Sequence, residues 1–261
     1  MSDFTTTRFE IGDTAVTIAA DAIHVPHAVD AILNARAEIE RKISKDPFFL
    51  TTFEPYECAR TDGEAVRRMC EASRAAGVGP MAAVAGAIAQ AGLEAMAANG
   101  CGHGWVDNGG DIALVLEKPA IIEIYSEPGA SEAAALEMEP EGEIVGVCSS
   151  SGRLGHSISL GESNVSVAIG DSAVLADAVA TAIGNGIRRE EDLETCHEPF
   201  RHLRGLRGGL VMFDDSVSMW GRVPRIVEVE HNPYRITAHS RMSAVVNAEN
   251  ASCESKDKVI H

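Results

Sequence analysis

The feature that most constrains the fold is an alanine- and glycine-rich segment at residues 81–99, MAAVAGAIAQAGLEAMAAN. Its side chains are small and apolar on nearly every face of a helix. This composition predicts a helix whose backbone is approached closely by a neighbouring element or by a ligand. Tight helix packing without any ligand explains the same pattern, and the segment alone does not separate the two.

A chain of 261 residues, 45% of them hydrophobic, lies at the upper end of what one core supports. We therefore expect residues 1–241 to form one domain or two intimately packed lobes. Residues 242–261 are polar with alternating charge and are predicted to be a flexible C-terminal tail.

The formal charge of −17 excludes nucleic acid as an expected partner, because a field of that sign repels phosphate backbones. Solubility accounts for such a charge. An anionic ligand would need a metal ion or helix N-termini to offset the field.

Residues 1–9 are polar and threonine-rich and lack the basic start and apolar run of a secretory signal. We also expect no apolar stretch long enough to cross a bilayer, hence no membrane partner and a cytoplasmic protein. The six cysteines are scattered without a CxxC pair, which argues against structural zinc and is consistent with a reduced compartment.

Helices and strands are interleaved without a strict βαβ repeat, which predicts an α+β fold with mixed or antiparallel sheets packed against helices. Residues 8–20 predict a hairpin that turns at Gly12-Asp13. Residues 48–62 are expected to be a loop, and the acidic, alanine-rich residues 128–141 a surface insertion. Helices are expected at 27–45, 63–76, 81–99 and 172–184, and further strands at 112–117, 120–125, 143–148, 156–160, 164–168, 210–213 and 225–230.

The first candidate site is the run Asn108-Gly109-Gly110-Asp111, directly before a predicted strand. Consecutive glycines permit positive φ and let a flat or phosphorylated ligand approach the amides, while the aspartate accepts a hydrogen bond or binds a metal-held water. A plain hairpin turn is the alternative, since Asn-Gly is a favoured turn dipeptide.

The second candidate comprises Ser149, Ser150, Ser151 and Gly152, followed by His156. Hydroxyls and glycine amides are suited to holding phosphate oxygens, and His156 is suited to acid or base work. An ordinary polar loop with a structural histidine is the more common explanation of such a segment.

The third candidate pairs Asp177 with Thr181, which share one face of the predicted helix because they are four residues apart. Both are hard oxygen donors of the kind Mg²⁺ accepts. The alternative is an exposed position with the threonine bonded to its own backbone. Asp177 lies within the apolar run LADAVATAI, where a solvated carboxylate is not expected.

Taken in order, NGGDI, SGxxGH and ADxxxT resemble the motifs of the ApbE family of flavin transferases. The resemblance covers about residues 8–230. It is stronger for the short, lipid-free branch common in methanogenic archaea and some bacteria, through GPMAAVAGAIA, DNGGDI, SSGxxGHS and LADAxATAIGN.

The resemblance implies an Mg²⁺-dependent protein that binds FAD, cleaves its pyrophosphate and releases FMN and AMP or transfers FMN to a threonine of an acceptor protein. It implies Asp177, Thr181 and the carbonyl of Ala82 as metal ligands. Asn108, Gly109, Gly110, Asp111, Ser150, Ser151 and Gly152 would bind the flavin nucleotide, and His156 with Asp177 would serve the phosphoryl chemistry.

Two departures concern the implied chemistry. A lysine or glutamate usual before the helical glycine is replaced by Ala85, and a His-Ile-Ile-Asp-Pro segment is replaced by residues 156–160, HSISL. A noncatalytic protein that binds a flavin or another small ligand is therefore the alternative. A role in sulfur assimilation, namely homocysteine synthesis in methanogens, is a further one, with Cys58, Cys101 and Cys148 as thiol carriers or as inert buried residues. A homo-oligomer is compatible with the sequence.

Overall fold

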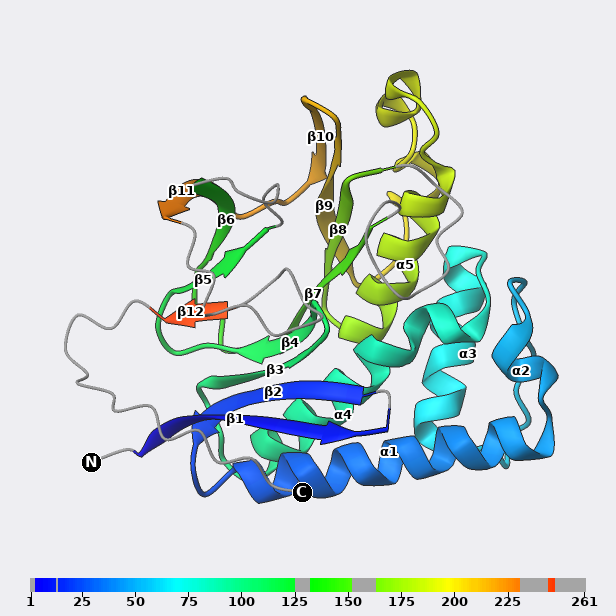
Figure 1. Cartoon of the computed structure of the whole chain (residues 1–261), viewed down its shortest axis with the longest axis vertical. Coiled ribbons are helices and arrows are strands. Elements are labelled where there is room, and N and C mark those ends of the chain that lie inside the picture. Colours follow the sequence, from blue (N-terminus) through cyan, green and yellow to red (C-terminus); the bar gives the residue numbers. More distant parts are fainter. Residues whose placement is uncertain (1–2, 13, 125–131, 152–162, 231–243, 247–261) are drawn as a thin grey trace.

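The computed structural model describes residues 3–12, 14–124, 132–151, 163–230 and 244–246. They form an α+β fold in which a large antiparallel sheet carries helices on one face and a small antiparallel sheet on the other (Figure 1). The predicted fold class is confirmed.

The large sheet has the order β1-β2-β3-β4-β7-β8-β9-β10, and every neighbouring pair is antiparallel. The predicted hairpin of β1 and β2 is confirmed, and Gly12 at its turn has φ +55°. The strands are β1 (Phe4–Ile11), β2 (Thr14–Asp21), β3 (Gly104–Asn108), β4 (Asp111–Val115), β7 (Val145–Ser150), β8 (Val165–Gly170), β9 (Leu206–Phe213) and β10 (Ser216–Gly221).

The small sheet has the order β11-β6-β5-β12, with β11 (Arg225–Glu230), β6 (Glu132–Met138), β5 (Ala120–Glu123) and β12 (Ala244–Val246). The expected surface insertion at 128–141 is wrong where it can be examined. β6 is a central strand, paired with β11 and β5, and its Ala135 and Leu136 are fully buried. Within the predicted tail, 244–246 pair with β5, and 247–261 lie outside the described residues.

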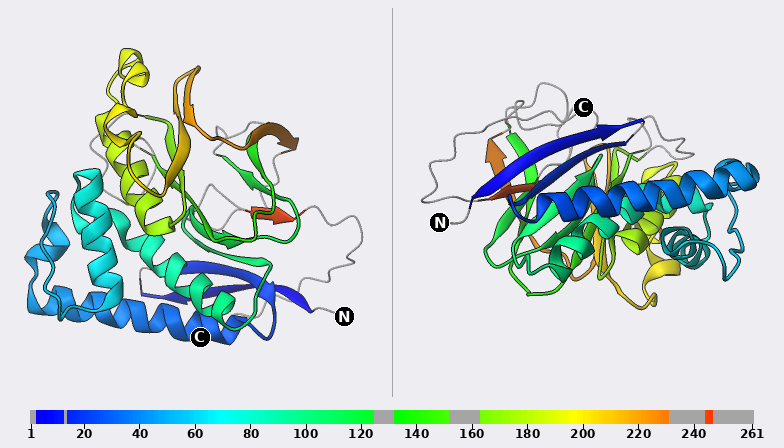
Figure 2. Two further views of the ribbon diagram at one scale, coloured as in Figure 1. Left: turned by 180° about the vertical axis from the view of Figure 1, so that it is seen from behind. Right: turned by 90° about the horizontal axis from the view of Figure 1, so that it is seen from below.

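The helices are α1 (Val25–Lys45), α2 (Phe48–Thr51), α3 (Glu64–Ala76), η1 (Pro80–Ala83), α4 (Val84–Ala98), α5 (Ala173–Gly186), η2 (Glu190–Glu194) and η3 (Glu198–Phe200). The four predicted helices are therefore confirmed, although residues 81–99 divide into a 3₁₀ turn and an α-helix. The predicted loop at 48–62 begins with the single turn of α2. Two views from other sides show α1 lying along one side of the molecule (Figure 2). α4 packs on α1 and on β3 and β4, while α5 packs on β7 and β8.

Two apolar cores fill the space on either side of the large sheet. Side chains alternate along β4, so that Ala113 and Val115 pack with the helices while Ile112 and Leu114 pack with the small sheet. Asp111 lies two residues before Ala113 in the same strand, so its side chain also faces the helices. This orientation places the carboxyl group of Asp111 within the candidate site described below.

The segment Pro80–Ala98 is long and apolar enough, by length and composition alone, to cross a membrane. The expectation that no such stretch exists is thus corrected. Half of this segment is buried inside the protein, against α1, α5 and the large sheet, as in a core helix. Its small side chains permit that close packing on several faces.

Candidate functional site

The glycine turn is a tight hairpin loop between β3 and β4. Asn108 pairs with Asp111 across the ladder, and Gly109 and Gly110 have φ of +70° and +100°. Positive φ at both loop positions is the geometry for which Asn-Gly and Gly-Gly are selected. The Gly110 amide donates to Asp107 Oδ1 at 2.8 Å, so a carboxylate that precedes the motif closes the turn.

Two further hydrogen bonds fix the turn against neighbouring elements. Asn108 Nδ2 donates to the carbonyl of Ala85 on α4 at 3.2 Å, and Ser149 Oγ of β7 donates to the carbonyl of Gly110 at 3.2 Å. The sequence motif is therefore a hairpin turn and also a docking point for the start of α4.

Asp177 is a buried residue of α5, with 6% of its surface exposed, and it faces the start of α4. Its Oδ2 accepts from the Gly86 amide at 2.8 Å. Gly86 is the third residue of α4, so the carboxylate satisfies an amide that has no partner within its own helix. The negative charge also lies at the positive end of the α4 dipole.

Gly86 is required for this contact. A Cβ at Gly86 would lie 2.3 Å from the carbonyl oxygen of Ala173 and 2.8 Å from Cβ of Asp177. The close approach predicted for the alanine-rich helix is thus made by α5. Gln90, one turn further along α4, accepts from the Ala173 amide at 2.8 Å and fixes the start of α5 as well.

The structure brings Asp111 and Asp177 together, as the order of the motifs predicted. Each charge raises the cost of ionising the other, and burial dominates both shifts. The pKa of Asp111 lies well above its ordinary value through burial and then through the charge of Asp177, and burial raises the pKa of Asp177 to about 7. Asp111 Oδ1 is buried without a hydrogen-bond partner among the described residues.

The thiol of Cys148 completes this group. Cys148 pairs with Asp111 in the β4–β7 ladder, so both side chains face the helices. Its Sγ donates to the carbonyl of Ala173 at 3.3 Å and also lies within hydrogen-bonding reach of Asp111. Burial raises the pKa of this thiol well above its ordinary value, which keeps it protonated and unreactive.

Asp107 lies next to this group, but its side chain points to the other face of the sheet. Trp105, two residues earlier in the same strand, points to that face and belongs to the second core. Burial raises its pKa to about 7. Its carboxylate is used by the turn, through Gly110.

The donor set fits a cation. Within the described part of the chain, Asp111 and Asp177 form no ion pair with a lysine, arginine or histidine, so a negative charge on either buried carboxyl group would have no counter-charge. The described part of the chain as a whole contains no group of three His, Cys, Asp or Glu side chains placed to hold a metal ion. The implied ligand set is of another type, with one carboxylate, one hydroxyl and one carbonyl. Half-buried Thr181 follows Asp177 by one turn of α5, and η1, which carries Ala82, packs on α5.

The serine segment is divided by the limits of the described residues. Ser150 ends β7, with its carbonyl accepting from Ser166 Oγ at 3.2 Å, and Ser151 follows it. Gly152 and His156 lie outside the described residues, so their predicted roles stay predictions. Asp107 and Gln90 were missed, and only Asp107 had a sequence signal, as the acidic residue before Asn-Gly-Gly. Cys148 had been named as a thiol carrier or an inert buried residue, and it is buried.

A separate hollow lies elsewhere in the protein. A cavity of about 630 Å³ is lined by His197, Arg201, Met219, Trp220, Gly221, Val223, Pro224 and Ile226. The His197 and Trp220 rings stack there with centroids 5.9 Å apart and an interplanar angle of 6°. No carboxylate is among these lining residues.

Comparison with known proteins decides the family. A family model described as AbpE bacteria matches residues 1–204. The UPF0280 protein of Methanocella arvoryzae is 42% identical over 232 residues, covering 89% of this chain and 95% of that protein. The chain belongs to the UPF0280 family. Another member, from Archaeoglobus fulgidus, is 37% identical over 235 residues, covering 88% of this chain and 97% of its own length.

Solved structures place this UPF0280 protein in the ApbE fold. The flavin transferase ApbE from Vibrio cholerae superposes with a TM-score of 0.57 at 12% identity, covering 85% of this chain and 97% of that one. The apo flavinyl transferase ApbE from Pseudomonas stutzeri superposes with a TM-score of 0.54 at 13% identity, covering 84% of this chain and 94% of that one. The resemblance to the ApbE family, including the branch in methanogenic archaea, is confirmed.

Proposed function

We propose that this UPF0280 protein is an Mg²⁺-dependent flavin-nucleotide protein that binds FAD and cleaves its pyrophosphate. The observation that carries the proposal is the buried pair Asp111 and Asp177, which face each other beside the glycine turn without a counter-charge. FMN released by the cleavage would go to water or to a threonine of an acceptor protein.

Asp177, Thr181 and the carbonyl of Ala82 would hold the metal ion. Mg²⁺, when bound, supplies the positive charge that a pyrophosphate requires and orients its oxygens for in-line attack. In a chain of charge −17, this local positive charge answers the electrostatic requirement set by an anionic ligand.

The protein's own residues fix the geometry of the site. Asn108 and Gly86 hold the turn and α5 against α4, so the carboxylates cannot move apart to relieve their repulsion. The backbone of Gly109 and Gly110, with Asp111 and the hydroxyls of Ser150 and Ser151, would line the flavin nucleotide. Gly152 and His156 would follow them in sequence, the latter close to the phosphoryl group.

A noncatalytic flavin-binding protein is the second candidate. The position before Gly86 is Ala85, which contributes its carbonyl to Asn108 and brings no charged side chain to the phosphoryl region. A protein with this site would bind the nucleotide and leave its pyrophosphate intact. The thiol-carrier role in sulfur assimilation receives no support, since Cys101 and Cys148 are buried with raised pKa values and Cys58 is paired with Cys70.

The purified protein should be incubated with FAD, with and without Mg²⁺, and the products separated by chromatography. Equal amounts of FMN and AMP that appear only with Mg²⁺ would support cleavage. Intact FAD together with calorimetric binding would support the noncatalytic candidate. Absence of both products and binding would contradict the proposal.

A further inference from the structure

Two cysteines join the loop that follows α2 to helix α3. Cys58 lies in the loop and Cys70 on α3, with a Cα–Cα distance of 6.2 Å across the disulfide and a sequence separation of 12. The sequence did not predict this pair, because its spacing matches no recognised motif. Cys58 is half-buried and Cys70 is 4% exposed, so an external reagent meets Cys58 first.

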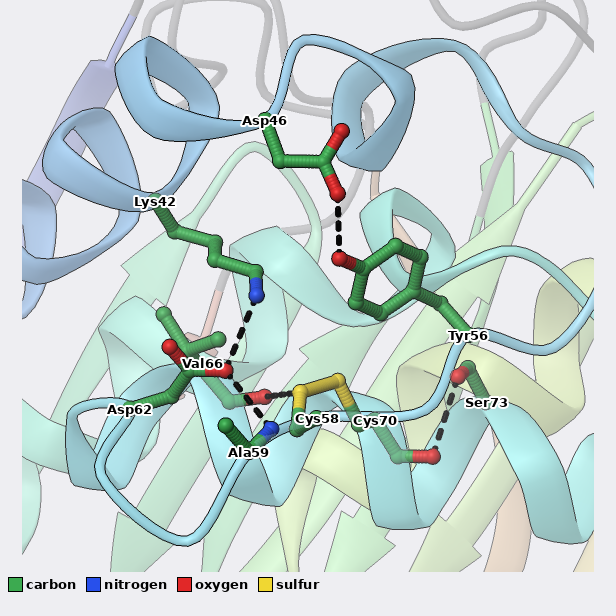
Figure 3. The surroundings of a disulfide bond; sticks show 9 residues. All are labelled: Lys42, Asp46, Tyr56, Cys58, Ala59, Asp62, Val66, Cys70 and Ser73. Carbon is green, nitrogen blue, oxygen red and sulfur yellow. Dashed lines mark hydrogen bonds and ion pairs between the residues drawn. A yellow bond between two sulfur atoms is a disulfide. The ribbon is translucent and has the colours of Figure 1, made fainter.

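The loop has contacts that do not depend on the disulfide (Figure 3). Asp62 accepts from Lys42 Nζ and from the Ala59 amide, both at 2.9 Å, and the hydroxyl of Tyr56 donates to Asp46. These contacts anchor both ends of the loop segment to the end of α1. The carbonyl of Val66 lies 3.4 Å from Sγ of Cys58, where it would accept from a reduced thiol. The reduced protein thus retains a folded loop with satisfied polar groups.

The beginning of the loop lies against the beginning of η1. A Cβ at Gly79 would come within 2.0 Å of the Thr52 carbonyl and 3.0 Å of Cα of Phe53, so the two backbones are in direct contact. Gly79 is the residue that caps η1, which runs into α4 and Gly86. The other half of the disulfide is also close to the site, because α3 packs on both η1 and α5.

We propose that Cys58 and Cys70 are a redox-active pair that exchanges with small disulfides and thereby regulates the site through η1. In the oxidised protein the loop is tied to α3, which holds Thr52 and Phe53 against Gly79. In the reduced protein this constraint is lost and η1 is less ordered. The regulatory part rests on the proposed function, because η1 carries the carbonyl of Ala82.

The exchange is balanced. The thiolate of Cys58 attacks a small disulfide RSSR, forming a mixed disulfide and releasing one RS⁻, which takes up a proton. The thiolate of Cys70 then displaces the second RS⁻ and closes the protein disulfide. Two protein thiols are oxidised while one RSSR is reduced to two RSH.

The test compares the full chain after treatment with glutathione disulfide and after treatment with a phosphine reductant. Thiol titration in denaturant should find four free thiols after oxidation and six after reduction, given the six cysteines of the chain. Hydrogen exchange of the amides at 81–86 should be at least about threefold slower in the oxidised form, since tying the loop removes openings that expose them. Six thiols after oxidation, or slower exchange confined to 58–70, would overturn the proposal.

Two variants make the test specific. Cys58→Ser should show the fast exchange of the reduced form under both treatments. Cys196→Ser, which removes a half-buried free cysteine, should respond as the native protein does. An identical response of Cys58→Ser and the native protein would also overturn the pair's role.

Calorimetry with Mg²⁺ separates this inference from the proposed function. We expect about threefold tighter binding to the oxidised form, through preorganisation of η1. Equal binding to both forms would overturn the regulation. If neither form binds Mg²⁺, the proposed function fails and the regulation with it, whereas the exchange comparison still decides whether the pair acts on η1.

Discussion

The site around Asp111 and Asp177 differs from the cavity beside Trp220 in whether its charged groups have partners. At the site, Asp111 and Asp177 are buried beside each other without a cation among the described residues. At the cavity, the charges are already paired, with Arg201 donating to Glu198 at 2.8 Å. The carboxyl groups of the site have no counter-charge among the described residues, whereas the cavity has volume and matched charge.

The difference shows why volume alone is a poor guide to function in this molecule. Burying a carboxylate without a partner costs several kcal/mol, which a protein keeps only where something else depends on it. Binding of a divalent cation with a phosphate would change the free energy of the site strongly. Binding of the same cation and phosphate would change the free energy of the cavity little. The predictions below test that contrast, from the largest expected effect to the smallest.

Substitution of Asp177 should have the largest effect. Asp177→Asn retains an oxygen that accepts from the Gly86 amide but removes the charge, so Mg²⁺ affinity and FMN release should fall by about 100-fold or more, the range seen when catalytic charge is removed. The free energy of unfolding, measured by thermal unfolding, should stay within about 1 kcal/mol of that of the native protein.

Asp177→Ala is the matched comparison. It removes charge and acceptor together, so it should lose the same activity and a further 1–3 kcal/mol, roughly, through the unsatisfied amide. If Asp177→Asn binds Mg²⁺ as the native protein does, the carboxylate is only a helix cap, and the contrast with the cavity disappears.

The pH dependence of stability tests the buried carboxylates directly. Burial raises the pKa of Asp107 to about 7 from the ordinary 3.8, so the folded protein holds a proton that the unfolded chain has released between these values. Stability from this group is therefore present below about pH 4 and is lost as pH rises through 7, on the order of 4 kcal/mol.

Urea unfolding of metal-free protein at pH 5 and pH 8 measures this change. The native protein should be less stable at pH 8. Asp107→Asn, which preserves an acceptor for the Gly110 amide, should show a smaller difference. A difference unaltered by the substitution would assign the pH dependence to other groups.

Gly86→Ala tests the close approach of α4 and α5. The added methyl group would meet the Ala173 backbone at 2.3 Å, so overpacking should cost about 1–3 kcal/mol and separate Asp177 from its amide. Gly186→Ala is the control, because it is also helical and has no neighbour within 4 Å. Equal thermal stability of the two variants would show that the helices are not in contact at Gly86.

Much of the fold was readable from local patterns. The β1–β2 hairpin and α1 follow from alternation and from helical spacing, because each pattern fixes one buried face. β6 was missed, since glutamates and alanines resemble a solvated segment until two neighbouring strands are known.

The site was predictable only in part, for a related reason. Gly109, Gly110 and Asp177 stand out because their types are unusual in their positions. Asp107 and Cys148 act through contacts with residues distant in sequence or on another strand, and no spacing rule reveals those partners. The Cys58–Cys70 pair was missed likewise, since its distance is set by how the loop folds back on α3.

The smallest effect is expected at the cavity. Arg201→Ala combined with Met219→Ala alters two exposed lining side chains, and surface changes of this kind shift stability by about 0.5 kcal/mol or less. FAD affinity, measured by calorimetry with Mg²⁺, should stay within about twofold of the native value. A loss of tenfold or more would place the nucleotide in the cavity, because there the guanidinium would be its nearest positive charge. The unmatched carboxylates would then need an occupant other than the one proposed, and the contrast between the two regions would be reversed.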